Sequence, residues 1–205
     1  MAHPKAGSLN HSIAAVAIDS LIKLGHEVIF HDLYAERFDP VITHQEIQGE
    51  EPKDPLVCQH CTEAESANGY IFVHPNWWGQ PPAILKGWID RVLRPGLAYQ
   101  FASDDNGGGV PIGLLKERSA IVFNTSNTAT SREIEVFKDP LETLWKNCIL
   151  GFCGINDVYR KTFSIVCLSG SETITVWLDE VRERVIVHFP FPHVEKLKNT
   201  TDTDG

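Results

Sequence analysis

The pattern of apolar and polar positions divides the chain into strands and amphipathic helices that alternate. Residues 69–73 and 119–123 form short, nearly unbroken apolar runs, which are typical of strands buried on both faces. Residues 27–32 and 157–166 are rich in β-branched and aromatic side chains, which favour extended structure. We therefore predict four strands, separated by helical segments, in an α/β fold.

Helical periodicity marks the segments around these strands. The first helix is predicted to begin at Ser8, a favourable N-cap residue, and to end at Gly25. Pro82 can open another helix, because its missing N–H would have no partner in the first turn. Further helices are predicted over residues 59–67, 139–148 and 172–188. Residues 36–56 are expected to form a polar connection of low regularity.

The most informative stretch is residues 74–92, H-P-N-W-W-G-Q-P-P-A-I-L-K-G-W-I-D-R-V. Its prolines and Gly79 exclude a continuous strand or helix over residues 75–81, so these residues must form a loop. The loop joins a buried strand to an amphipathic helix. Because ligands of open α/β sheets bind beyond the carboxyl ends of the strands, this loop is a candidate binding element.

This stretch resembles the NAD(P)H:quinone oxidoreductase family of flavodoxin-like flavoproteins. The P-A-I-L-K-G-W at residues 82–88 and the D-R-V at residues 90–92 match the family segment nearly letter for letter. The resemblance implies a flavodoxin-like, doubly wound parallel sheet. It also implies an enzyme that transfers hydride from NAD(P)H, through bound FMN or FAD, to a quinone or similar two-electron acceptor. Family members are cytoplasmic homodimers whose flavin lies at the subunit boundary.

The resemblance places three loops around the flavin. Residues 3–10 open the first helix, where free N–H groups and the helix dipole favour a phosphate. The loop after residues 69–73 would contact the flavin ring through its backbone amides, and the N-T-S-N segment after residues 119–123 would form the third contact. The implied cofactor-binding residues are His3, Ser8, Asn10, Pro75, Asn76, Trp77, Trp78, Gly79, Asn124, Thr125, Ser126 and Asn127.

Plainer interpretations of these residues stay open at this point. Ser8 alone could be an ordinary N-cap, and Trp77 and Trp78 could pack in the core or face a partner. The third loop reads N-T-S-N where well-known eukaryotic members have T-T-G-G, and residues 128–150 contain no Tyr or His that could assist the reduced flavin. No catalytic side chain is therefore predicted, because the flavin carries the chemistry. The compact third loop resembles that of bacterial FMN-type members, which favours FMN slightly, although the first loop also resembles that of FAD-type members.

The start of the chain departs from the family. Only seven residues precede the first predicted helix, whereas the family has an apolar central strand before its first loop. We therefore expect the first strand of the sheet to be missing from this chain. Either the chain is truncated before Met1 or the sheet has an empty central slot, in which backbone groups of two neighbours would lack partners.

Composition narrows the function classes. A net charge of −9 and the absence of a basic run argue against nucleic-acid binding. No apolar segment of membrane-spanning length and no signal peptide are found, and five cysteines suggest free thiols in a reducing cytoplasm. The lone C-x-x-C at residues 58–61 lacks the second pair of a structural zinc site, so no metal is predicted.

One domain is expected over residues 1–193, followed by a mobile polar tail over residues 194–205. Two other functions remain as alternatives. The missing strand suggests a non-enzymatic or truncated relative that keeps the dimer surface and acts as a regulatory protein. A flavodoxin-type electron carrier is the third possibility, although such carriers lack the P-A-I-L-K-G-W helix.

Overall fold

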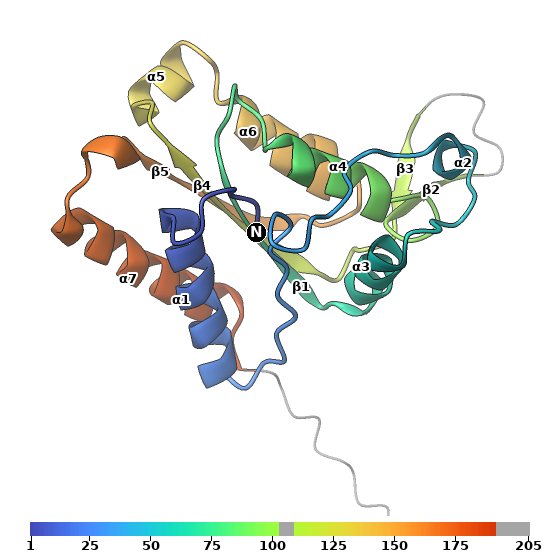
Figure 1. Ribbon diagram of the computed structural model, residues 1–205, viewed down its shortest axis with the longest axis horizontal. Coiled ribbons are helices and arrows are strands. Elements are labelled where there is room, and N and C mark those ends of the chain that lie inside the picture. Colours follow the sequence, from blue (N-terminus) through green and yellow to red (C-terminus); the bar gives the residue numbers. More distant parts are fainter. Residues whose placement is uncertain (103–108, 192–205) are drawn as a thin grey trace, which may run out of the picture.

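The computed structural model describes residues 1–102 and 109–191. Its centre is a parallel sheet in the order β1-β4-β5, formed by β1 (Gly69–Pro75), β4 (Ser119–Ser126) and β5 (Asp157–Ser164) (Figure 1). A separate antiparallel hairpin pairs β2 (Tyr99–Phe101) with β3 (Pro111–Gly113). The α/β architecture and the flavodoxin-like parallel sheet agree with the prediction.

Helices cover both faces of the sheet. The elements α1 (Leu9–Lys23) and α7 (Ser171–His188) lie side by side on one face, and Ile13 and Val181 pack there against Phe123 and Phe163 (Figure 1). The other face carries α3 (Pro55–Ser66), α4 (Ala83–Val92), α6 (Pro140–Thr143) and the π-helix η1 (Leu144–Gly151). The remaining short elements are α2 (His44–Ile47), α5 (Thr130–Glu135) and the 3₁₀ helix η2 (Val166–Leu168).

Two strands, β1 and β4, reach further toward their carboxyl ends than the sequence indicated, whereas β5 ends earlier. β1 extends to Pro75 and β4 to Ser126, and the two pair in parallel register up to Pro75 opposite Thr125. β5 ends at Ser164, because Ile165 adopts a left-handed conformation with φ of 61°. The third predicted loop is therefore largely strand, and only Asn127 of its four residues lies beyond β4.

The prediction of a strand over residues 27–32 is wrong. A strand requires a hydrogen-bonded neighbour, and within the described residues the backbone of residues 27–30 has none. Met1 and Ala2 connect this segment to β1 only at its end: the Met1 amine donates to His31 O at 2.8 Å, and Ala2 N donates to Val73 O at 3.0 Å. The side chains of Ile29 and Phe30 remain about half exposed.

Two helices differ from their predicted bounds. The helix expected over residues 59–67 begins earlier, at Pro55, because the Asp54 carboxylate accepts a hydrogen bond from Leu56 N and caps it. The helix expected over residues 139–148 is divided into α6 and η1 and continues to Gly151. The sequence analysis did not predict α5, whose six residues are too few for a clear periodic signal.

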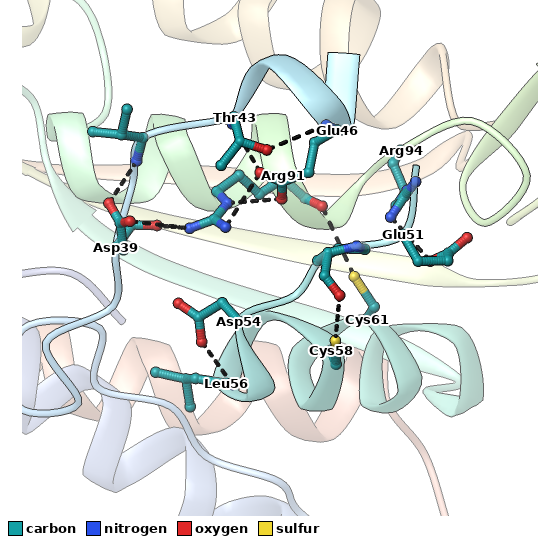
Figure 2. A network of polar contacts seen from close by, with 12 residues as sticks. Asp39, Thr43, Glu46, Glu51, Asp54, Leu56, Cys58, Cys61, Arg91 and Arg94 are labelled. Carbon is teal, nitrogen blue, oxygen red and sulfur yellow. Dashed lines mark hydrogen bonds and ion pairs between the residues drawn. The ribbon is translucent and has the colours of Figure 1, made fainter. Parts of the chain in front are cut away.

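The polar connection over residues 36–56 is held in place by one buried arginine (Figure 2). Arg91 on α4 donates from Nε to Glu46 Oε1 at 3.0 Å and from Nη1 to the Asp39 carbonyl at 2.7 Å. Thr43 and Glu46 form a reciprocal capping box on α2. Ion pairing and capping thus fix a segment that contributes little to the apolar core.

None of the helices within residues 1–102 and 109–191 has both the length and the apolar composition needed to cross a bilayer. The predicted tail over residues 194–205 lies outside the described residues.

Candidate functional site

The structure brings the three predicted loops together at the carboxyl edge of the sheet. Thr125 is the residue that joins them. Its hydroxyl accepts a hydrogen bond from Asn10 Nδ2 at 2.9 Å, and its carbonyl accepts one from Asn76 N at 2.7 Å. One residue from each loop therefore takes part in a single hydrogen-bonded contact, although Asn10, Asn76 and Thr125 lie far apart in the chain.

The first loop ends at the amino terminus of α1. Ser8 occupies the N-cap position with extended backbone, but its hydroxyl lies 2.8 Å from His11 Nδ1 and does not cap the helix. The His11 and Ser12 amides donate to the Ser8 carbonyl, whereas those of Leu9 and Asn10 have no partner among the described residues, and an anion is favoured there. His3 lies at the start of this loop, where its Nδ1 accepts a hydrogen bond from Lys5 N at 3.1 Å. Burial lowers the pKa of His3, so the ring is neutral near pH 7.

Asn10 shows that the first loop has unmet hydrogen-bonding capacity. Its side chain is buried, and its Oδ1 has no hydrogen-bond partner among the described residues. A buried acceptor without a partner is costly, and a donor on a bound ligand would remove that cost.

The second loop presents two tryptophans to solvent. Trp78 is fully exposed and adopts a left-handed backbone with φ of 58°, and the Trp77 side chain is 41% exposed. This exposure excludes core packing for Trp78. Trp77 and Gln80 exchange two backbone hydrogen bonds of 3.0 Å, and Gly79 N donates to Asn76 Oδ1 at 2.9 Å, so the turn is internally fixed. The Trp78 amide, in contrast, has no partner in the described part of the chain.

The third segment differs most from its prediction. Asn124, Thr125 and Ser126 are buried within β4, and only Asn127 is exposed. The Asn127 side-chain oxygen accepts a hydrogen bond from Cys167 N at 3.0 Å. The side chain of Asn124 points into the molecule, so this residue contributes to the interior polar network described below.

Sequence reasoning missed three polar residues that support these loops. Glu133 on α5 accepts hydrogen bonds from Asn76 Nδ2 at 3.1 Å and from Ser126 Oγ at 3.3 Å, and thus connects the second and third loops. His74 and Arg160 lie on the buried face of the sheet beneath them. The sequence feature that could have revealed them is a histidine directly after one predicted strand and an arginine within another. A polar side chain buried in a sheet must find hydrogen-bond partners.

A polar cavity of about 210 Å³ lies between α5 and the carboxyl end of β5. Its lining includes Asn76 of the second loop, Glu133, Arg160, Thr162 and Ser164. Arg160 is neutralised there, because it forms ion pairs with Asp139 and with Glu142. The cavity therefore continues from the second loop, and the charges of its lining residues balance.

A second polar cluster lies away from this edge, at α3. His31, Glu36 and His60 each offer one atom that could ligate a metal, and these three atoms lie within 4.8 Å of one another. However, Trp88 Nε1 donates to His60 Nδ1 at 2.8 Å, so the neutral His60 ring carries its proton on Nε2 and has no lone pair there for a metal. Nearby, Cys58 and Cys61 are free thiols, and burial raises the pKa of Cys61 to about 11.

The comparisons with known proteins place these features in context. Residues 1–174 match the family described as having a flavodoxin-like fold. The chain is 32% identical over 177 residues to NAD(P)H dehydrogenase [quinone] 1 of Rattus norvegicus. The aligned region covers 75% of this chain and 63% of the rat protein. The chain is 35% identical over 150 residues to an NAD(P)H oxidoreductase of Haemophilus influenzae, which covers 70% of each chain.

The fold is also found in a solved FMN complex. The FMN-dependent NADH-azoreductase of Bacillus anthracis, determined with FMN bound, superposes with a TM-score of 0.67 at 17% identity. The superposition covers 89% of this chain and 92% of the azoreductase. At this identity the likeness demonstrates a shared fold.

Proposed function

The chain belongs to the flavodoxin-like family that includes the quinone-type NAD(P)H dehydrogenases, and we propose that it is a flavin-dependent NAD(P)H oxidoreductase. Its acceptor would be a quinone or a similar two-electron acceptor, as the names of its relatives indicate. The chain spans 63% of the length of the rat relative, so the activity is inferred from the shared part. The observation that carries the proposal is the convergence of three loops on Thr125 below an exposed Trp78.

The residues present fit a flavin. The free amides at the start of α1, next to Ser8, would hold the phosphate, and the unpartnered Oδ1 of Asn10 offers an acceptor for a hydroxyl group of the ligand. Trp77, Trp78 and the free amide of Trp78 would hold the flavin ring. When bound, the flavin supplies the hydride chemistry.

The protein's own contribution is binding and orientation. Oriented backbone N–H groups near the ring can stabilise negative charge without rearranging, because neighbouring hydrogen bonds hold them in place. The 76–80 turn is held by such bonds, and Glu133 fixes its position relative to Ser126. Within the described residues, Asn127 offers the only exposed side chain of the third segment to the rim of the site.

We propose FMN as the bound flavin and NAD(P)H as the co-substrate. We also propose that the protein is a homodimer in the cytoplasm. A structural neighbour with the same fold binds FMN. All five cysteines are free thiols, which is consistent with a reducing compartment. Exposed apolar side chains beside the second loop support a subunit interface at this edge.

One purification tests the proposal. The protein is purified without denaturation, the released cofactor is identified by mass spectrometry, and oxidation of NADH and NADPH is followed with a quinone acceptor. We expect FMN and quinone-dependent oxidation. Colourless protein that takes up neither FMN nor FAD on reconstitution would contradict the proposal. FMN binding without NAD(P)H oxidation would indicate an electron carrier.

A further inference from the structure

His74 is a completely buried polar side chain beneath the candidate site. Its solvent exposure is 0%, and it lies on β1 opposite Asn124 on β4. Both ring nitrogens are engaged. Nδ1 lies 2.8 Å from the Pro75 carbonyl, whereas Nε2 lies 2.7 Å from Asn124 Nδ2 and 3.0 Å from Trp145 Nε1.

These contacts determine the tautomer of His74. The indole N–H of Trp145 can only donate, so His74 Nε2 is an acceptor and the ring proton is on Nδ1, where it is donated to the Pro75 carbonyl. The orientation of Asn124 is determined independently, because its Oδ1 accepts a hydrogen bond from Arg160 Nη1 at 3.2 Å. Its NH₂ group must therefore face His74.

We propose that His74 is a positioning residue for the flavin site, acting through Pro75 and Asn124 to fix the second and third loops relative to one another. This inference rests on the proposed function. His74 itself does not reach the surface, so it touches neither cofactor nor substrate. His74 contacts Pro75, which precedes Asn76, and Asn124, which precedes Thr125. Asn76 N and the Thr125 carbonyl form the hydrogen bond between the two loops.

The network behind His74 makes this position rigid. Arg160, which bonds to Asn124, is itself held by ion pairs to Glu142 and Asp139 from α6 and its N-cap. Trp145 comes from the π-helix that follows. Loss of the His74 acceptor would leave the NH₂ of Asn124 and the indole N–H of Trp145 buried without partners, and both would move to recover hydrogen bonds.

The test uses a ring of similar size that cannot form hydrogen bonds. His74→Phe fills most of the space while removing the donor and the acceptor. The matched control is His60→Phe. His60 is equally buried and also accepts a hydrogen bond from a tryptophan indole, Trp88, but it lies on α3, away from the loops. His74→Gln, which keeps an acceptor near the Nε2 position, serves as the conservative variant.

We expect His74→Phe to weaken FMN binding about tenfold, measured by fluorescence titration at a temperature where the apoprotein is folded. His60→Phe should lower the melting temperature to a similar extent but leave FMN affinity unchanged, and His74→Gln should recover part of the lost affinity. Equal FMN affinity in His74→Phe and wild type, or equal losses in both Phe variants, would overturn the inference. Wild-type protein that binds no flavin would instead contradict the proposed function.

Discussion

Trp78 combines full solvent exposure with a left-handed backbone, two features that rarely coincide in a large aromatic residue. The left-handed conformation costs about 1–2 kcal/mol for a residue with a Cβ atom. The neighbouring turn imposes it, because Trp77 and Gln80 bond to each other across Trp78 and Gly79. Strain of this kind together with exposure suggests a residue held in place for contact with a ligand or partner.

Replacement of Trp78 by Ala should therefore reduce flavin affinity with little effect on stability. The lost stacking corresponds to about 1 kcal/mol, or a several-fold weaker binding constant. Since the side chain makes no core contact, the melting temperature of the apoprotein should stay within experimental scatter of wild type. Melting curves and FMN titration of the same preparation provide the check. A strongly lowered melting temperature with unchanged FMN affinity would show that Trp78 is structural.

His74 should make stability depend on pH in the acid range. Burial lowers the pKa of His74 to about 4, although the hydrogen bond to the Pro75 carbonyl opposes the shift. Because the unfolded chain takes up this proton near the ordinary histidine pKa of about 6.5, native stability falls as pH decreases from there to about 4. The loss attributable to His74 should reach about 3 kcal/mol at the lower end. Urea unfolding between pH 7 and 4 measures it, and His74→Gln should show a shallower decline.

Among single residues, the sequence proposed candidates at the surface of the site but not the residues that support them. Trp78 and the first turn of α1 followed from motif and helix-start signals; Trp78 is exposed, and its contact with a flavin stays a prediction. Asn124 was predicted to line the site, but its side chain faces Arg160. A strand end and a loop residue have similar local sequence signals, and only the register of β4 against its neighbours decides which side chains are buried.

Among the elements, α4 is fixed most tightly by a close backbone approach. A Cβ atom at Gly87 would lie 2.2 Å from the Pro40 carbonyl oxygen and 2.3 Å from Pro40 Cβ. The connection over residues 36–56 therefore crosses α4 at its glycine, a few residues from the Arg91 ion pairs (Figure 2). Here a helical glycine is required for packing, despite its low helix propensity.

Gly87→Ala should consequently destabilise the protein, although Ala is the better helix former. The steric overlap involves backbone atoms that cannot rotate away, so a loss of about 1–3 kcal/mol is expected, larger than the propensity gain of about 1 kcal/mol. Thermal and urea unfolding measure the change. Gly170→Ala shows the effect of a Cβ that meets no atom within 4 Å, at the N-cap of α7 where Ala gives no propensity gain. A stabilised Gly87→Ala variant would mean that residues 36–56 do not pack on α4 as described.

At the element scale, the sequence located the strands and helices whose patterns are self-contained. The strand predicted over residues 27–32 failed because strand formation depends on a neighbour, which a local pattern cannot reveal. The π-helix after α6 was missed for a related reason. Its apolar positions resemble those of an α-helix, and Trp145 and Leu150 are buried in the core as they would be in an α-helix.

For the molecule as a whole, the family resemblance supplied what composition could not. Net charge and apolar content indicate only an acidic globular protein, whereas the 74–92 stretch indicated the fold, the loop cluster and the class of cofactor. The remaining question is how molecules associate. Apolar side chains stay exposed around the second loop and α5, namely Trp78, Ile134, Val136 and Phe137.

These side chains form the surface that we expect to be buried between two subunits. α5 adjoins the second loop, because Asn76 donates a hydrogen bond to Glu133 on α5. An apolar surface next to a ligand site is a common feature of subunit interfaces. Val136 lies at the C-cap of α5 and is 56% exposed, so it can be changed without disturbing the core.

Val136→Asp should convert a dimer into a monomer, because a carboxylate buried at the interface would lack a partner. Light scattering coupled to size-exclusion chromatography, at micromolar concentration with FMN present, measures the mass. Val187→Asp is the matched control: Val187 is 70% exposed and lies in the last turn of α7, a different helix from α5, so this variant should remain dimeric. If wild type is already monomeric, the proposed homodimer is wrong. If Val136→Asp remains a dimer while Val187→Asp dissociates, the interface involves α7.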